Sequence, residues 1–194
     1  MDSALRMPES VMTETVLPAA NYDLAATLSS GQAFRWNLQT DGWESAIGRQ
    51  WVRLRSVPQG IHATTWPTVE SWGWLTHYLQ SELNLSTVLQ TFPADPAMLA
   101  SVEACRGLRL LRQDPWECLA SFILSSTKQI VQIRQICETL CLRYGEPIRL
   151  PNCATTIHSF PSSQAIAACS VGGWALRSAG RASRRFVESV QFAW

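Results

Sequence analysis

Residues 43–65, WESAIGRQWVRLRSVPQGIHATT, decide the fold of the first half of the chain, because apolar and polar residues alternate in short runs through them. Thr40-Asp41-Gly42 precedes the first run, and Gly48-Arg49 separates it from the second. An Asp-Gly pair between alternating runs is a strong hairpin signal. The pattern predicts three or four antiparallel strands, over Ala33–Asn37, Trp43–Ile47, Gln50–Arg55 and Gly60–Thr65.

Helical spacing replaces this alternation after residue 67. One apolar stripe of helical period is formed by Val69, Trp72, Leu75, Tyr78 and Leu79. Further helices are predicted over 85–92 and from Asp95-Pro96 to about Cys105, since an acidic cap followed by proline is a common helix start. A sheet followed by helices, rather than alternating strands and helices, indicates the α+β class.

The clearest helix start is Asp114-Pro115-Trp116-Glu117. Asp114 can cap the helix, Pro115 suits its first turn, and Glu117 stands where it could reach back to the cap. The predicted buried face comprises Trp116, Leu119, Ala120, Ile123 and Leu124.

A short polar connection follows at residues 125–129. A second helix is predicted to end at Gly145, with a buried face of Ile130, Ile133, Cys137, Leu140, Cys141 and Tyr144. Residues 147–161 are expected to form a loop and 162–168 a short helix. Two buried helices joined by a polar turn would make a rigid platform.

Composition allows a globular core but leaves the partner open. The chain has 194 residues, 46% of them hydrophobic, and a formal net charge of +1. Lys128 is the only lysine, and the other cationic side chains are arginines. Arginine binds phosphates and guanine edges with two parallel hydrogen bonds, yet a GC-rich genome would produce the same bias.

The six cysteines show no spacing typical of a metal site, and no cofactor is expected. We expect all six to be reduced core residues of a cytoplasmic protein, associated with the nucleoid if the source is bacterial. Neither a signal peptide nor a membrane-spanning run is indicated.

Two motifs carry a family resemblance. Residues 28–36, LSSGQAFRW, resemble the S-G-Q-x-F-R-W motif of the 8-oxoguanine DNA glycosylases. Residues 107–119, GLRLLRQDPWECL, are similar to the run that opens the helical part of that family. The polar connection and His158-Ser159-Phe160-Pro161 follow in the family's order, so the resemblance covers about residues 22–180.

The resemblance implies an enzyme that swings oxidised guanine out of duplex DNA and removes it. In that family the glycine of S-G-Q offers its carbonyl to the N7 hydrogen that 8-oxoguanine has and guanine lacks. Gly31 occupies this place, and Gln32 beside it is expected to contact the base. The alternative for Gly31 is a glycine needed only for the turn.

The same resemblance places a DNA contact at the polar connection. Its candidate residues are Ser126, Thr127, Lys128, Gln129 and Gln132. The family often has arginine in the place of Gln132, so selectivity for cytosine opposite the lesion is in question. Ser183 or Arg184 lies nearest to the family's wedge into the duplex. The alternative for Lys128 and Gln129 is a solvated turn.

The family's lyase step needs a lysine amine and a nearby aspartate, which belong to a helix-hairpin-helix segment that this sequence lacks. We therefore expect no catalytic residue here and no activity from this chain alone. Either the sequence is a fragment or frameshifted gene, or it is a short DNA-binding protein that lost catalysis. A generic α+β interaction module is the further alternative.

The expected organisation has three parts and a monomeric state. Residues 1–20 would be a loose arm, 21–106 the α+β domain, and 107–194 the first helices of an incomplete helical glycosylase domain. The expected partner is double-stranded DNA containing oxidised guanine. No association with a membrane is expected. The apolar face of residues 114–144 is expected to be partly exposed and to lower solubility.

Overall fold

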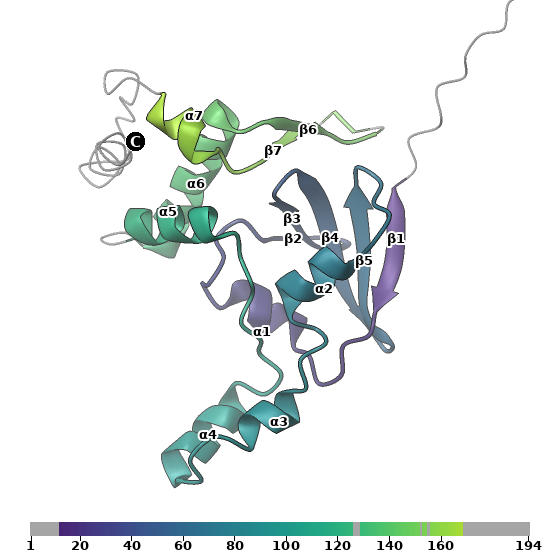
Figure 1. Cartoon of the computed structure of the whole chain (residues 1–194), viewed down its shortest axis with the longest axis vertical. Helices are drawn as coiled ribbons and strands as arrows, with labels where there is room; N and C mark the ends of the chain where they lie inside the picture. Colours follow the sequence, from purple (N-terminus) through teal and green to yellow (C-terminus); the bar gives the residue numbers. More distant parts are fainter. Residues whose placement is uncertain (1–11, 126–128, 152, 155, 169–194) are drawn as a thin grey trace, which may run out of the picture.

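A five-stranded antiparallel sheet forms one side of the molecule in this computed structural model, which describes residues 12–125, 129–151, 153–154 and 156–168 (Figure 1). Its strands lie in the order β1-β5-β4-β3-β2. Their bounds are β1 Thr13–Leu17, β2 Asn37–Gln39, β3 Gly42–Ile47, β4 Gln50–Val57 and β5 Gly60–Trp66. The α+β class and the three predicted strands after residue 42 are confirmed.

Three features of this half differ from the prediction. Residues 13–17 are no loose arm, because β1 pairs with β5, with Thr15 opposite Ala63. Residues 33–36 are not a strand: β2 begins only at Asn37, since Ala33 and Trp36 turn into the core instead of alternating. Residues 24–29 form a helix that was not predicted, α1 Leu24–Ser29, whose cap Asp23 accepts from the Ala26 amide at 2.8 Å.

Two helices cover one face of the sheet. They are α1 and α2 Gly73–Leu79 (Figure 1). The core between helices and sheet includes Leu28, Trp36, Leu54 and Leu79, each at most 1% exposed. Burial of such side chains stabilises the fold by about 1.5–3 kcal/mol each. Of the predicted apolar stripe, Leu75, Tyr78 and Leu79 are buried on α2, whereas Val69 and Trp72 precede the helix and are partly buried.

Two short helices, α3 Leu85–Leu89 and α4 Pro96–Ala104, project together from the lower end of the molecule in Figure 1. Asn84 caps α3 and Asp95 caps α4. The cap and proline predicted for the second of these helices are confirmed.

The remaining helices form a second core. Their bounds are α5 Pro115–Ser125, α6 Ile130–Tyr144 and α7 Ser163–Ala167. Ala120, Leu124, Leu140 and Ile166 are buried between them. The three predicted helices are confirmed, and Asp114 caps α5 by accepting from the Glu117 amide at 2.9 Å.

The prediction of a loop over residues 147–161 is wrong in part, because this segment contains two short strands. β6 Pro147–Arg149 and β7 Thr156–His158 pair with each other in a two-stranded sheet. Ile148 packs against Trp51 of the large sheet, and the Trp66 indole donates to the Arg149 carbonyl at 2.9 Å. This hairpin therefore joins the helical half to the sheet half.

The predicted buried faces are wrong at two positions. Leu119 is 53% exposed and Ile130 52%, and their neighbours Phe122 and Val131 are exposed by 73% and 64%. Cys137 and Cys141 are buried as expected, whereas Cys105, Cys118 and Cys153 are exposed, and Cys169 lies outside the described residues. Among the described helices, none has the length and apolar character needed to span a membrane.

Candidate functional site

The loop after α1 holds the first predicted site residue, Gly31. Its φ is +86°, a left-handed conformation that residues with a side chain rarely adopt. A Cβ built on Gly31 would lie 3.8 Å from Cδ1 of Ile130, the first residue of α6. The structure therefore brings the S-G-Q loop beside the start of α6, two segments about a hundred residues apart in sequence.

The carbonyl oxygen of Gly31 is a free hydrogen-bond acceptor among the described residues. Within the described residues, no intramolecular hydrogen bond reaches this oxygen. A buried acceptor without a partner costs about 1–3 kcal/mol, whereas one open to solvent or to a ligand can be satisfied from outside. The Gly31 carbonyl can thus accept a hydrogen bond from a bound group.

Gln32, the second predicted site residue, points its amide into the protein. Its Nε2 donates to the carbonyls of Thr27 at 3.0 Å and Arg109 at 2.9 Å. Its Oε1 accepts from the Leu111 amide at 2.7 Å. The side chain therefore anchors the loop to the segment 107–113, and a contact with a base stays a proposal.

The segment 107–113 is extended and held at several points by the sheet half. The Asp23 amide donates to the Gly107 carbonyl at 2.8 Å, and the Arg112 amide donates to the Tyr78 carbonyl at 2.8 Å. The side chain of Gln113 donates to the main-chain carbonyl of Gln32. The two motifs that carry the family resemblance are thus bound directly to each other.

Arg35 links the loop to three further elements. Its guanidinium donates to the carbonyls of Ala46 in β3 and His158 in β7 and lies 3.5 Å from the Glu117 carboxylate in α5. Burial raises the pKa of the Glu117 carboxyl above its ordinary value, and the neighbouring Arg35 guanidinium only partly offsets this. The sequence predicted that Glu117 would reach back to the cap of its helix. In the structure it pairs with Arg35 instead.

The start of α6 carries two predicted DNA-binding residues. Gln129 and Gln132 are exposed, and the Gln129 amide donates to Oε1 of Gln132 at 3.2 Å. Ser126, Thr127 and Lys128 lie outside the described residues, as do Ser183 and Arg184. The structure therefore brings Gln129 and Gln132 to the end of α6 that faces the Gly31 loop.

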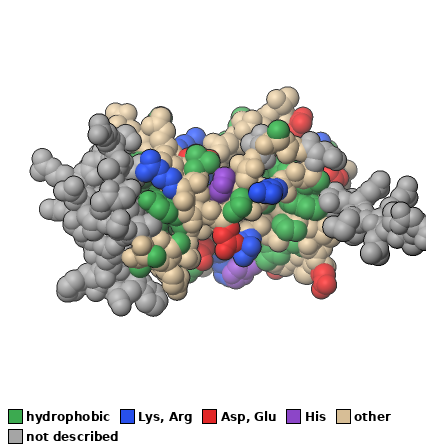
Figure 2. Space-filling view, turned by 90° about the horizontal axis from the view of Figure 1, so that it is seen from above, with side chains coloured by type: hydrophobic (Ala, Val, Ile, Leu, Met, Phe, Trp, Pro, Cys, Tyr) green, Lys and Arg blue, Asp and Glu red, His purple; other side chains and the backbone are tan. Residues whose placement is uncertain are grey.

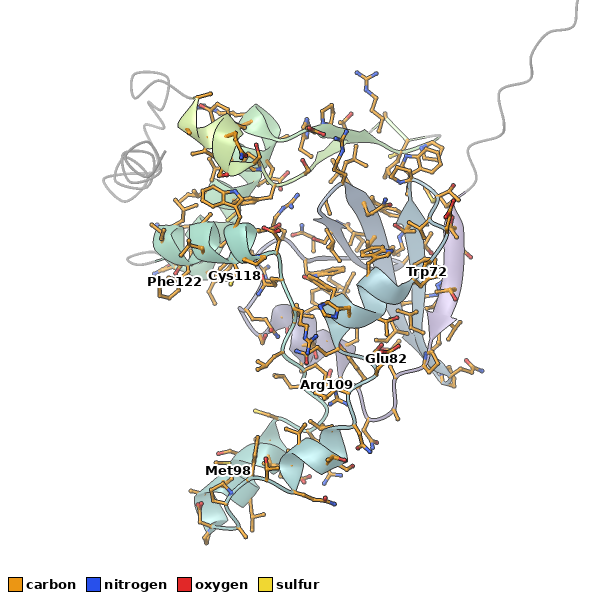
Figure 3. All side chains as sticks on the ribbon, viewed as in Figure 1. Trp72, Glu82, Met98, Arg109, Cys118 and Phe122 are labelled. Atoms are coloured by element: carbon orange, nitrogen blue, oxygen red, sulfur yellow. The ribbon has the colours of Figure 1, made fainter. Side chains whose placement is uncertain are left out.

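Ile130 is a residue that sequence reasoning missed, because its place in the helical period assigned it to the core. Its exposed side chain forms an apolar wall beside Gly31. In Figure 3, Cys118 and Phe122 project from the side of α5 that faces away from α7. Of these apolar side chains, that of Ile130 borders the Gly31 loop.

A hollow of about 380 Å³ opens between the residues after the loop and α6. Its polar lining includes Asn37, Arg134, Gln135 and Glu138, with Phe34 at one side. A second cavity, of about 630 Å³, lies between α3, α4 and residues 107–110 and is mainly apolar. None of the predicted site residues lines this second cavity.

On the face seen from above, charge alone does not mark a binding site. In the view from above, acidic and basic side chains are interspersed rather than gathered in one basic patch (Figure 2). In the part of the chain that the structure describes, no three His, Cys, Asp or Glu side chains gather as metal ligands.

The comparisons with known proteins agree with the motifs. Residues 15–119, more than half of the chain, match the family described as 8-oxoguanine DNA glycosylase, N-terminal domain. The N-glycosylase/DNA lyase of Saccharomyces cerevisiae is 31% identical over an alignment of 163 residues, and the match covers 73% of this chain and 41% of the yeast protein.

Solved structures share the fold. MBOgg1 in complex with a low affinity DNA ligand aligns with a TM-score of 0.81 and 23% identity, over 94% of this chain and 62% of that one. The Clostridium acetobutylicum 8-oxoguanine glycosylase/lyase, in complex with double-stranded DNA that has cytosine opposite 8-oxoG, aligns with a TM-score of 0.78 and 19% identity, over 95% and 65% of the two chains. The chain spans less than two thirds of the length of each of these relatives. The family match over more than half of the chain, together with the motifs and the shared fold, shows that the chain belongs to the 8-oxoguanine DNA glycosylase family.

Proposed function

We propose that this chain binds duplex DNA containing 8-oxoguanine and supplies the part of a base-excision repair enzyme that distinguishes the oxidised base. The observation that carries the proposal is the Gly31 carbonyl, which is free to accept and lies beside Ile130 at the start of α6. The N7 hydrogen of 8-oxoguanine would donate to it, whereas guanine would present a lone pair there.

The polar residues around the start of α6 are proposed to contact the DNA. Ser126, Thr127, Lys128, Gln129 and Gln132 would contact phosphates or the bases next to the extruded nucleotide, with Ser183 and Arg184 as further contacts. Gln132 replaces an arginine that is common in the family, so we propose a weak preference for cytosine opposite the lesion.

A gel-shift comparison tests lesion recognition. We expect the chain to bind an 8-oxoguanine duplex about 5- to 100-fold more tightly than the same duplex with guanine, because guanine leaves the Gly31 acceptor unpaired. Both duplexes are measured at one salt concentration, since phosphate contacts depend strongly on salt. Equal affinities would contradict the proposal and favour a protein without lesion preference.

We further propose that the chain alone does not perform the lyase step. Lys128 is its only lysine, and it lies in the polar connection between α5 and α6. A Schiff base with the sugar requires a lysine amine at the reacting carbon. The proteins matched in yeast and Clostridium are named as lyases, and the chain spans less than two thirds of the length of each.

Borohydride trapping on an 8-oxoguanine duplex and on an abasic duplex tests this second proposal. We expect no covalent adduct from the wild-type chain or from Lys128→Arg. An adduct formed by the wild type and lost in Lys128→Arg would identify Lys128 as the nucleophile. An adduct in both proteins would identify another amine, and either result overturns the proposal.

A further inference from the structure

We propose that Gln113 is a positioning residue for lesion recognition, because it holds the main-chain carbonyl of Gln32, one peptide beyond the Gly31 carbonyl. This inference rests on the proposed function. The side-chain amide of Gln113 donates to the main-chain carbonyl of Gln32, 81 positions earlier in the sequence. Gln113 itself lies one residue before Asp114, the cap of α5.

Residue 32 is held from two directions. Its side chain is bound to the Arg109 carbonyl and the Leu111 amide, and its main-chain carbonyl is bound by Gln113. With the side chain and the main-chain carbonyl of Gln32 both held, the orientation of the Gly31–Gln32 peptide is limited on its Gln32 side, next to the left-handed φ of Gly31. The orientation of the Gly31 carbonyl therefore depends on the contact from Gln113.

The same contact relates the loop to the helix pair. Gln113 is continuous with α5, and α5 packs against α6 through Leu124 and Leu140. Ile130, at the start of α6, is the residue nearest to the space beside Gly31. A hydrogen bond from Gln113 to Gln32 thus sets the loop relative to the apolar wall against which a base would lie. A misaligned acceptor loses most of its hydrogen-bond energy, because such bonds weaken steeply with angle.

Methionine substitutions provide the test, since methionine has about the length of glutamine and no amide. Gln113→Met removes the donor to the Gln32 carbonyl. Gln80→Met is the matched control: the Gln80 amide also donates to a carbonyl of the segment 107–113, that of Leu110 at 2.6 Å, but away from Gly31. Gln113→Lys retains an N–H donor on a side chain long enough to reach Gln32.

Fluorescence anisotropy with the full chain compares the affinities for 8-oxoguanine and guanine duplexes. We expect Gln113→Met to lower the lesion preference about tenfold while changing the affinity for undamaged DNA less than about twofold. Gln80→Met should retain the preference, and Gln113→Lys should restore most of it. Thermal unfolding of each variant establishes that it is folded.

The outcomes separate this inference from the proposed function. A wild-type chain that binds both duplexes equally overturns the proposed function and, with it, the role of Gln113. A selective wild type with an equally selective Gln113→Met overturns the role of Gln113 alone. If Gln113→Met does not fold, loss of preference in a folded Gln113→Lys overturns the inference, and retained preference supports it.

Discussion

Gly31 combines a left-handed backbone with open space at its Cβ position, so two possible reasons for a glycine there can be distinguished. At φ +86° a side chain would cost about 1–2 kcal/mol, yet a Cβ would make only an ordinary contact, 3.8 Å from Ile130. The cost of Gly31→Ala is therefore conformational and not a clash. An alanine at this position should move the peptide away from its left-handed form.

We expect Gly31→Ala to lower the free energy of unfolding by about 1–2 kcal/mol and to abolish the preference for 8-oxoguanine DNA. Gly48→Ala is the matched control, because Gly48 has φ +56° and nothing within 4 Å of its Cβ position. It should lose similar stability and keep the preference. Denaturant unfolding and gel shifts measure both quantities; a selective Gly31→Ala variant would leave Gly31 with a role in the turn only.

The sequence could predict the place of Gly31 but not the role of its neighbour. Gly31 belongs to a local motif, and motifs can be read directly. Gln32 was expected to face a base, yet its amide binds the segment 107–113, whose residues follow some 80 positions later. Ile130 was missed for a related reason: helical period predicts a buried face only where something packs against it.

The tie between α5 and the sheet depends on Arg35 and the buried Glu117. Because burial raises the pKa of Glu117 in the folded state, the folded chain binds this proton more tightly than the unfolded chain does. The stability associated with this group is then greatest below the ordinary carboxyl pKa and declines as pH rises through the raised value.

We expect Glu117→Gln to remove this decline. Between about pH 4 and pH 7, the unfolding free energy of Glu117→Gln should rise relative to that of the wild type. Glu82→Gln, at an exposed position labelled in Figure 3, controls for the loss of one carboxyl. Urea unfolding at several pH values measures the difference. A constant difference would show that folding leaves the pKa of Glu117 unchanged, and a difference that falls with pH would show that folding lowers that pKa; either result contradicts the prediction.

Helix starts and hairpin partners were predictable, whereas the pairing of β1 with β5 and the β6–β7 hairpin were not. The caps Asp95 and Asp114 act on amides two or three residues away, so the local sequence contains the whole signal. β1 has its partner in β5, about fifty positions later, and short alternation in Thr13–Leu17 gives no hint of it. The β6–β7 hairpin likewise depends on the packing of Ile148 against Trp51. The domain boundary predicted at residue 107 stays a prediction.

At the scale of the whole molecule, apolar side chains on α5 and α6 remain in contact with water. Leu119, Phe122, Ile130 and Val131 are all more than half exposed. Exposed apolar groups of this kind promote association, since their burial against another surface is favourable. We therefore expect the chain to be monomeric at low concentration and to associate as its concentration rises.

We expect Phe122→Gln to reduce concentration-dependent association, with a change in unfolding free energy within about 0.5 kcal/mol. Leu38→Gln is the matched control, because Leu38 is 65% exposed and belongs to β2 instead of α5. Light scattering over a range of protein concentrations measures the effect. Equal improvement in both variants would mean that general surface polarity, and not this helix face, governs association.

The alkylation rate of two buried thiols, those of Cys137 and Cys141 on α6, reports how often the helix pair α5 and α6 opens. Burial raises the pKa of Cys137 to about 11 and that of Cys141 to about 12, so neither forms a reactive thiolate at neutral pH. Cys105, Cys118 and Cys153 are exposed and open to alkylation. Slow modification of the two buried thiols by iodoacetamide would therefore time the separation of α5 from α6, and DNA that holds these helices together should lengthen that time.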